Sequence, residues 1–271
     1  MTTAGIVLCG GRSSRMGRAK AWLPWGGRPM VAHVVDVLRK VVDEVVVVTA
    51  ADLDVPRVDA RVVRDRAPHG GPLAGILEGL EHIAAERAFV TGTDAPFLTP
   101  AFVAAMLGAG EAAAPLVDDF VQTLSAVYPR SARGRAGELL AAERRRPLNL
   151  LEAMEFRRVP PSELPDTAST RGFNTPDAYL DASRERFGAA TATLELVGRA
   201  RAQLAIDRRE VPIGTLREAL SRLGPGLEIE RDGRVLPPFI VSLGGREFVR
   251  DTAVPIGPDE RAIVLDASAG G

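Results

Sequence analysis

The sequence is poor in several residue types that large classes of proteins depend on. It contains one cysteine among 271 residues, which excludes an internal disulfide. Its three histidines, His33, His69 and His82, do not follow the spacing of a metal site. The formal net charge is -1, so no global basic field is present to attract nucleic acid. We therefore expect a soluble globular protein that does not bind nucleic acid.

Long apolar runs and a targeting segment are also missing. The first residues lead directly into the strand-like residues 6–8, without a basic region ahead of a long apolar stretch. No uninterrupted apolar run is long enough to span a bilayer. We expect a cytoplasmic protein that makes no membrane contact. The lone Cys9 follows the strand-like run, where a buried structural thiol is favoured over a nucleophile.

The first half of the chain alternates short apolar runs with helical patterns. The runs are rich in β-branched residues, as buried strands of a parallel sheet are, and apolar residues then recur at helical spacing. Strands are expected at residues 5–9, 45–48, 62–63, 88–90, 113–117 and 124–128, and helices at 29–42, 72–83, 102–107, 134–145 and 176–187. Repeated βα units predict an α/β, Rossmann-like domain with a mostly parallel sheet over residues 1–187.

The pattern changes after a run of small residues at 188–192, which we interpret as a linker. Strands are expected at residues 193–197, 201–206, 240–243 and 262–265. A helix is expected to begin at Thr215 with a capping box to Glu218 and to end at Gly224. The order ββαββ predicts a small α+β, ubiquitin-like β-grasp domain over residues 193–271.

A glycine-rich segment after the first strand is the strongest chemical signal. It reads Leu8-Cys9-Gly10-Gly11-Arg12-Ser13-Ser14-Arg15-Met16-Gly17-Arg18-Ala19-Lys20. Its glycines allow backbone N–H groups to approach a ligand, and Arg12, Arg15, Arg18 and Lys20 bring positive charge. The spacing is neither that of a Walker A loop nor that of a Rossmann fingerprint. Lysine is rare in this chain, so Lys20 favours a specific role. We interpret the segment as a cradle for a triphosphate; the alternative is a solvated glycine-rich turn.

Two further motifs follow at the ends of predicted strands. Asp94 comes after residues 88–90, and ligands of open α/β sheets gather at the carboxyl ends of strands. A carboxylate is a ligand that Mg²⁺ takes together with substrate phosphates; the alternative is an aspartate that caps the next helix. The second motif, Gly71-Pro72-Leu73-Ala74-Gly75, is expected to place a helix N-terminus beside the same crevice.

These motifs, together with Asn174-Thr175-Pro176, resemble those of the molybdenum cofactor guanylyltransferases and of their relatives that cytidylylate the same cofactor. The resemblance implies that a phosphate of molybdopterin attacks the α-phosphate of a nucleoside triphosphate and releases pyrophosphate. It implies Mg²⁺ on Asp94, catalytic roles for Arg15 and Lys20, and an acceptor contact at Asn174. The implied nucleotide-binding residues are Leu8, Cys9, Gly10, Gly11, Arg12, Lys20, Asp65, Gly71, Pro72, Leu73 and Asp94.

The sequence departs from that family at two positions. Ala19 stands where an aspartate is common, and Gly172 stands where an asparagine is common. Asp65 is the best match to the residue that recognises guanine, so GTP is expected as the donor. The alternatives are CTP, another phosphorylated acceptor, or a cofactor-binding protein with impaired catalysis.

Residues 193–271 resemble the small sulfur-carrier proteins of the molybdopterin synthase and thiamine-biosynthesis type. The resemblance rests on the ββαββ order, on residues 248–252 and 257–260, and on the final Ala269-Gly270-Gly271. It implies that the carboxylate of Gly271 is adenylated and then becomes a thiocarboxylate, and that Gly270 and Gly271 enter a narrow enzyme channel. The implied partners are an activating enzyme and the large subunit of molybdopterin synthase; the alternatives are a docking module or an inactive carrier fold.

Overall fold

The computed structural model describes residues 2–10, 15–66 and 70–266. The chain forms two compact units, named here the N-terminal unit and the C-terminal unit. The N-terminal unit comprises Met1–Arg12, Lys20–Trp22 and Pro29–Gly172. The C-terminal unit comprises Ser13–Ala19, Leu23–Arg28 and Phe173–Gly271. The chain therefore passes between the units several times before residue 30.

The N-terminal unit alternates strands and helices, as the sequence predicts. Its strands are β1 (Thr3–Cys9), β4 (Glu44–Thr49), β5 (Arg61–Arg64), β6 (Arg87–Gly92), β7 (Ala113–Val117), β8 (Phe120–Val121), β9 (Ser125–Pro129) and β10 (Arg157–Val159). Its helices are α1 (Met30–Leu38), α2 (Gly71–His82), α3 (Pro100–Gly108), α4 (Arg133–Ala141) and α5 (Pro147–Glu152). Short 3₁₀ turns lie at Lys20–Trp22, Arg130–Ala132, Pro161–Glu163 and Ala168–Thr170.

These strands form one mostly parallel sheet in the order β10-β7-β9-β6-β1-β4-β5, with β8 paired to β7. Strand β1 lies between β4 and β6 and is parallel to both. Strand β9 is antiparallel to β6 and to β7. The expected α/β fold with a mostly parallel central sheet is confirmed. Its parallel strands all end at one edge, where ligands bind in open sheets.

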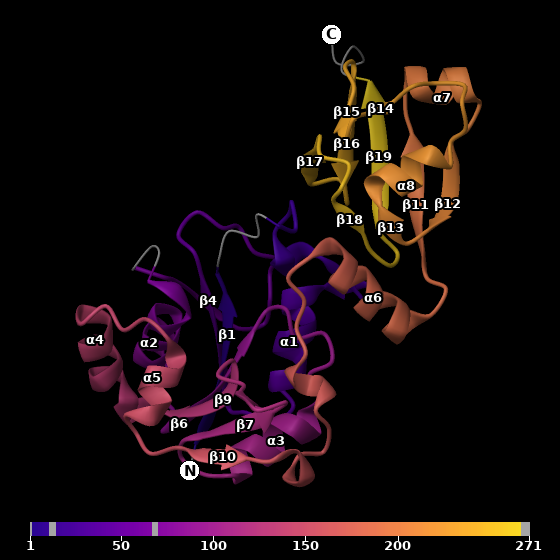
Figure 1. The fold of residues 1–271 in the computed structure, drawn as a ribbon. Helices are drawn as coiled ribbons and strands as arrows, with labels where there is room; N and C mark the ends of the chain where they lie inside the picture. Colours follow the sequence, from indigo (N-terminus) through magenta and orange to yellow (C-terminus); the bar gives the residue numbers. More distant parts are fainter. Residues whose placement is uncertain (1, 11–14, 67–69, 267–271) are drawn as a thin grey trace. The chain divides into compact units, whose positions relative to one another are not determined.

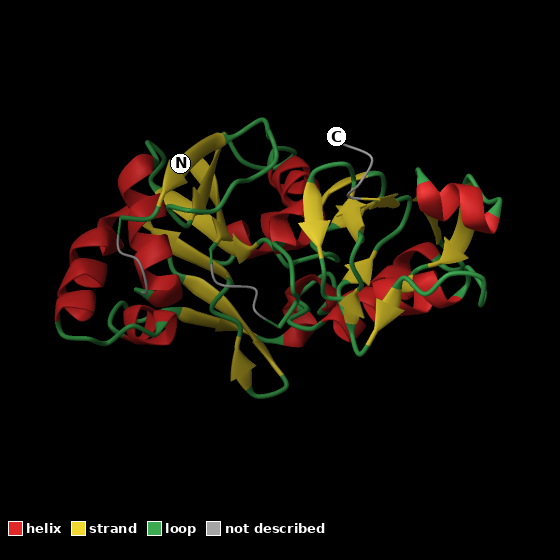
Figure 2. Ribbon diagram, turned by 90° about the horizontal axis from the view of Figure 1, so that it is seen from above, coloured by secondary structure: helices red, strands yellow, loops and turns green. Residues whose placement is uncertain are grey.

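Helices cover both faces of this sheet (Figures 1 and 2). One face packs against α2, α4 and α5, and the other packs against α1 and α3. Successive residues of β1 alternate between the two cores, with Ile6 on the first face and Val7 on the second. The central strands are buried on both sides, which explains their nearly uniform apolar sequences.

Helix α2 packs very close to β1 at two of its residues, Gly75 and Gly79, where a side chain would not fit without a shift. A Cβ atom on Gly79 would lie 2.6 Å from Cγ2 of Ile6, and one on Gly75 would lie 3.2 Å from Cδ2 of Leu8. Both are close contacts in a densely packed interior. The two glycines therefore set the distance between α2 and the sheet.

The C-terminal unit contains a five-stranded sheet in the order β12-β11-β19-β16-β17. Its strands are β11 (Thr191–Leu196), β12 (Arg208–Pro212), β16 (Phe239–Leu243), β17 (Glu247–Val249) and β19 (Arg261–Asp266). Shorter pairs are β13 (Gly214–Thr215) with β18 (Pro255–Ile256), β14 (Glu230–Arg231) with β15 (Arg234–Val235), and β2 (Pro24–Trp25) with β3 (Arg28–Pro29). Its helices are α6 (Pro176–Phe187), α7 (Arg199–Leu204) and α8 (Leu216–Ser221). Most pairings are antiparallel, but β11 and β19 are parallel.

Helix α8 begins as the sequence predicts. The Thr215 hydroxyl oxygen accepts a hydrogen bond from the Glu218 backbone N–H at 3.2 Å, and the Glu218 carboxylate accepts one from the Thr215 N–H at 2.7 Å. This reciprocal pair satisfies two backbone donors at the helix start. The face of the helix that carries Leu216 and Leu220 is buried in the core of the unit.

Two sequence-based expectations for this unit are wrong. Residues 201–206 were expected to form a strand, but residues 199–204 form α7. Alternation over six residues does not distinguish a strand from a short helix, and Arg, Ala, Gln and Leu all favour the helix. The segment 188–192 is also not entirely a linker, because β11 begins at Thr191.

Across the described ranges, no helix has the length and apolar character needed to cross a membrane.

We predict that Gly79→Ala destabilises the protein. The added methyl group meets Ile6 at 2.6 Å, so α2 or β1 must shift, at a cost of about 1–3 kcal/mol. Gly137→Ala is the matched control, since a Cβ atom at Gly137 of α4 meets nothing within 4 Å. That control is expected to stabilise the protein by about 0.5–1 kcal/mol through helix propensity. Urea unfolding of both variants measures the difference, and equal effects would contradict the proposed packing.

Candidate active site

An ion pair between Lys20 and Asp94 lies where the parallel strands end. Nζ of Lys20 is 2.7 Å from Oδ2 of Asp94, and both side chains are partly exposed. The two residues are 74 positions apart in the chain. The structure therefore brings together the lysine of the glycine-rich segment and the aspartate that the sequence singled out.

The register between β1 and β6 accounts for this meeting. Leu8 pairs with Gly92 in the parallel ladder, so both strands end at the same level. The backbone N–H and the hydroxyl of Thr93 each donate to the Leu8 carbonyl oxygen, both at 3.1 Å. This fixes the start of the Asp94 turn against the end of β1. Asp94 does not cap a helix, because α3 starts later and Thr99 is its N-cap.

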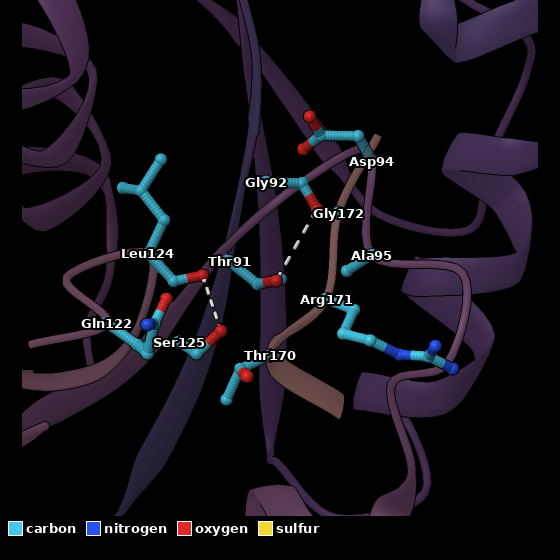
Figure 3. Close-up of a pocket in the computed structure, with 10 residues that line it drawn as sticks. All are labelled: Thr91, Gly92, Asp94, Ala95, Gln122, Leu124, Ser125, Thr170, Arg171 and Gly172. Atoms are coloured by element: carbon cyan, nitrogen blue, oxygen red, sulfur yellow. Dashed lines mark hydrogen bonds between the residues drawn. The ribbon is translucent and has the colours of Figure 1, made fainter. Parts of the chain in front are cut away.

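Two glycines make room for Asp94 (Figure 3). A Cβ atom on Gly92 would lie 2.5 Å from Oδ1 of Asp94, inside van der Waals contact. A Cβ atom on Gly172 would lie 2.9 Å from the Asp94 carbonyl oxygen. The glycine at 172 is therefore matched to this backbone, in which the asparagine common in the family does not fit without a shift.

A polar network holds the chain near Gly172 against the loop after Asp94. The buried Ser169 hydroxyl donates to the Phe97 carbonyl oxygen at 3.2 Å and accepts from the Thr99 N–H at 3.2 Å. Asp166 accepts from the Ser169 N–H at 2.7 Å and from the Thr99 hydroxyl at 3.2 Å. The guanidinium of Arg171 also stacks on the ring of Phe97, 4.3 Å from its centroid. The Asp94 turn is thus supported from a segment more than seventy residues away.

A small cavity of about 80 Å³ lies beside Asp94 (Figure 3). Its lining is Thr91, Gly92, Asp94, Ala95, Gln122, Leu124, Ser125, Thr170, Arg171 and Gly172. Ligand pockets usually enclose about 300–1,000 Å³, so this cavity is too small for a nucleotide. It has room for a few water molecules next to the carboxylate.

Cys9 is a buried residue at the end of β1. The residue is buried, and burial raises the pKa of its thiol to about 11; a hydrogen bond with Thr93 opposes this shift and the charge of Asp94 adds to it. The thiol is therefore neutral at physiological pH and is a poor nucleophile. The expected structural role agrees with this position.

The N-terminus of α2 carries the second glycine motif. Gly71 has φ +72°, a left-handed conformation that favours glycine, and Pro72 occupies the first turn, where its missing N–H costs nothing. Leu73 is fully buried in the core, so its side chain does not face a ligand. Gly75 serves the close packing of α2 on β1.

Asp65 follows β5, the edge strand on the β4 side. Its backbone N–H donates to the Thr49 carbonyl oxygen at 2.8 Å, and the residue is half-buried. Three strand spacings separate β6 from β5, which places Asp65 on the order of 14 Å from the Asp94 turn along the same sheet edge.

Not all predicted residues fall in the N-terminal unit. Arg15, Arg18 and Asn174 belong to the C-terminal unit. Arg15 and Asn174 are exposed, whereas Arg18, expected to add charge to the phosphate cradle, is buried against two glutamates. Gly11 and Arg12 lie outside the described residues, as do Gly270 and Gly271.

Sequence reasoning missed the groups that support Asp94. The contacts of Ser169 and Asp166 span about seventy residues, and no local pattern indicates them. Gly92 and Gly172 were visible in the sequence, but only the three-dimensional approach to Asp94 reveals their steric role.

Asp94 is the type of oxygen ligand that Mg²⁺ takes. The described part of the chain contains no group of three or more His, Cys, Asp or Glu side chains that could hold a metal ion. Mg²⁺ usually takes one or two carboxylates and completes its shell with water and substrate phosphates. One carboxylate beside an ammonium group therefore suits a metal that arrives with a triphosphate.

The fold and this edge define the class of protein as a nucleotidyltransferase, and comparison with known proteins agrees. Residues 5–157, more than half of the chain, match the MobA-like NTP transferase domain. A probable molybdenum cofactor guanylyltransferase of Bacillus cereus is 31% identical over 193 residues, which covers 67% of this chain and 96% of that protein. A Bacillus thuringiensis protein of the same name matches with the same identity and coverage.

Solved structures show the same fold. Molybdopterin-guanine dinucleotide biosynthesis protein A from Archaeoglobus fulgidus is 24% identical, with a TM-score of 0.57 over 69% of this chain and 98% of that one. A 4-diphosphocytidyl-2C-methyl-D-erythritol synthase from Anaerococcus prevotii is 15% identical, with a TM-score of 0.51 over 68% of this chain and 98% of that one. The chain belongs to the MobA-like NTP transferase family.

We predict that Asp94→Asn abolishes nucleotidyl transfer while the protein stays folded. The amide keeps the size of the side chain but removes the charge that faces Lys20, and the loss is expected to exceed about 100-fold in kcat. Pyrophosphate release measures the activity, and thermal unfolding checks the fold. Asp59→Asn, which removes an exposed carboxylate 2.7 Å from Arg39 in the same unit, is the control and is expected to keep wild-type activity. Turnover of Asp94→Asn close to that of the control would exclude Asp94 from the active site.

Proposed function

We propose that the protein transfers GMP from GTP to the phosphate of molybdopterin and releases pyrophosphate, with Mg²⁺ bound through Asp94. The observation that carries this proposal is the Lys20–Asp94 pair at the carboxyl ends of β1 and β6. It is supported by the names of the relatives, which are probable molybdenum cofactor guanylyltransferases.

The reaction needs no nucleophile from the protein. An oxygen of the acceptor phosphate forms a bond to the α-phosphorus of the triphosphate, and the bond from that phosphorus to the bridging oxygen breaks. The electron pair leaves with pyrophosphate. Cys9, at the end of β1, is buried with a raised pKa, in keeping with direct transfer. Alignment and charge neutralisation then account for catalysis.

Each residue at the edge has a stated role in this proposal. Lys20 binds phosphate oxygens and offsets the negative charge that develops on the leaving group. Asp94 holds Lys20 in place before the substrate binds, and the missing side chains at Gly92 and Gly172 leave room for Asp94. Asp94 would hold Mg²⁺, which would supply charge stabilisation in the transition state.

Asp65 is proposed to recognise guanine. A carboxylate accepts hydrogen bonds only, and guanine presents adjacent N–H donors, whereas the pairing edge of cytosine includes acceptors. Asp65 follows β5, which lies three strands from β6 in the sheet. In this proposal the base and the phosphates therefore bind at different points along the same sheet edge.

We predict that GTP is used in preference to CTP and that Asp65→Asn reduces this preference. Loss of a charged acceptor is expected to lower kcat/KM for GTP by about tenfold or more and to affect CTP much less. The measurement is pyrophosphate release with molybdopterin and each triphosphate in turn. Asp59→Asn again serves as the control. Equal or better turnover with CTP would contradict guanine recognition, and turnover only with another phosphorylated acceptor would contradict the molybdopterin assignment.

A second proposal concerns the C-terminal unit, for which we propose a β-grasp fold of the sulfur-carrier type. It is supported by the chain order of β11, β12, α8, β16 and β19, and by the parallel pairing of β11 with β19 inside the sheet. Carrier chemistry would require a free carboxylate on Gly271, and its partners would be an activating enzyme and the large subunit of molybdopterin synthase.

We predict that the full chain gains one oxygen-to-sulfur exchange when incubated with an activating enzyme, ATP and a sulfur source. A carboxylate becomes a good electrophile only after adenylation, so one extra residue after Gly271 is expected to block the exchange. Intact mass spectrometry of both proteins measures it. Exchange in both proteins would place the modified atom elsewhere, and exchange in neither would contradict a carrier role.

A further inference from the structure

Arg18, in the glycine-rich segment, is fully engaged within the C-terminal unit. Its side chain is 2% exposed. Nη1 and Nη2 donate to the two carboxylate oxygens of Glu260 at 2.9 and 2.7 Å, which is a bidentate fork. Nη1 also donates to the Pro255 carbonyl oxygen at 3.0 Å, and Nε donates to Glu247 at 3.2 Å. A guanidinium held on three sides in this way is not available to a phosphate.

The partners of Arg18 are themselves fixed by the sheet. Glu260 is buried, directly precedes β19 and accepts a further hydrogen bond from the Gly257 N–H at 3.0 Å. Glu247 is the first residue of β17. Burial alone lowers the pKa of Arg18, but the charge of Glu260 outweighs it and holds that pKa above its usual value. The Arg18 guanidinium is therefore charged throughout the physiological range.

The backbone at Gly17, next to Arg18, also packs against residues of the C-terminal unit. Gly17 has φ +67°, and a Cβ atom there would lie 2.8 Å from Cγ1 of Val254. Any side chain at position 17 would be strained in conformation and would also meet Val254. Met16 is buried as well. Residues 16–18 are thus fixed by packing, by backbone conformation and by the ion pair.

This anchored stretch lies immediately before Lys20 in the chain. Arg18 belongs to the C-terminal unit and Lys20 to the N-terminal unit, with only Ala19 between them. The backbone at Arg18 therefore limits the conformations in which the chain can reach Lys20. Because the Arg18 side chain is fixed two residues before Lys20, it restricts the backbone positions that Lys20 can take.

We propose that Arg18 is a positioning residue for nucleotide binding, with Glu260 and Glu247 as the anchors that fix the chain two residues before Lys20. The inference rests on the proposed nucleotidyl transfer by the Lys20–Asp94 edge. About a third of this chain lies outside the match to the Bacillus proteins, which are covered almost completely. Residues 247 and 260 lie beyond the part of the chain, residues 5–157, that matches the MobA-like NTP transferase domain.

The test compares Glu260→Gln with Glu228→Gln in the full chain. Glu260→Gln keeps the size of the side chain and removes the charge from the fork, whereas Glu228→Gln removes a carboxylate that pairs with Arg231 on the exposed surface of the same unit. We expect Glu260→Gln to lower kcat/KM for the triphosphate by about tenfold or more, through a higher KM and a lower kcat, because a displaced Lys20 binds the phosphates less well and stabilises the leaving group less. Glu228→Gln is expected to leave both constants unchanged.

Two further measurements separate positioning from a general loss of stability. Hydrogen exchange in peptides covering residues 15–22 is expected to rise in Glu260→Gln and to stay at the wild-type level in Glu228→Gln. Glu260→Asp, which retains the charge on a shorter side chain, is expected to recover part of the kcat/KM. If Glu260→Gln does not fold, Glu247→Gln takes its place with a smaller shift in the same direction, since that carboxylate accepts a single bond and is one-third exposed.

The outcomes distinguish this inference from the proposed function. If the wild-type protein releases pyrophosphate but Glu260→Gln matches Glu228→Gln in kcat/KM and in exchange, the positioning role is wrong and the proposed function stands. If the wild-type protein releases no pyrophosphate with any triphosphate, the proposed function fails. The inference is then decided by calorimetric affinity for GTP, where equal Kd values in the two variants would overturn it.

Discussion

The parallel pairing of β1 with β6 is the constraint on which the N-terminal unit depends. Because Leu8 lies opposite Gly92, the glycine-rich segment and the Asp94 turn leave the sheet at one level, and Thr93 locks that level with two bonds to Leu8. A slip of one residue in this register would turn every side chain of β1 to the opposite face. Gly79 adds to the constraint by admitting α2 close to Ile6 of β1.

Much of this unit could be predicted from the sequence because its signals are local. Uniform β-branched runs between helical patterns identify buried parallel strands, and a residue at the end of such a strand is automatically at the ligand edge, as Asp94 is. The C-terminal unit was less predictable where an element is only six residues long. At Arg199–Leu204 one turn and a half of helix has the same polar alternation as a strand, and helix propensity decided the outcome.

The charged residues of the site could be predicted from the sequence, but the residues that hold them in place could not. Lys20 and Asp94 carry the chemistry and lie in recognisable motifs, so both could be identified. The fit of Gly172 against the Asp94 carbonyl and the bonds of Ser169 depend on contacts between distant segments, which composition and spacing do not encode. Arg18 illustrates the opposite error. Its place among other basic residues suggested a phosphate ligand, whereas its environment is decided by Glu260, more than two hundred residues later.

The burial of Arg18 is better explained by geometry than by stability. Desolvating an arginine and a glutamate costs several kcal/mol each, and replacing such a pair with apolar residues is often neutral or stabilising, so folding alone does not require it. A bidentate fork does what an apolar contact cannot: it fixes orientation, because two parallel N–H···O bonds align the guanidinium plane with the carboxylate. An oriented anchor two residues before Lys20 is useful if the position of that ammonium group matters. It does matter where catalysis rests on aligning a triphosphate rather than on a protein nucleophile.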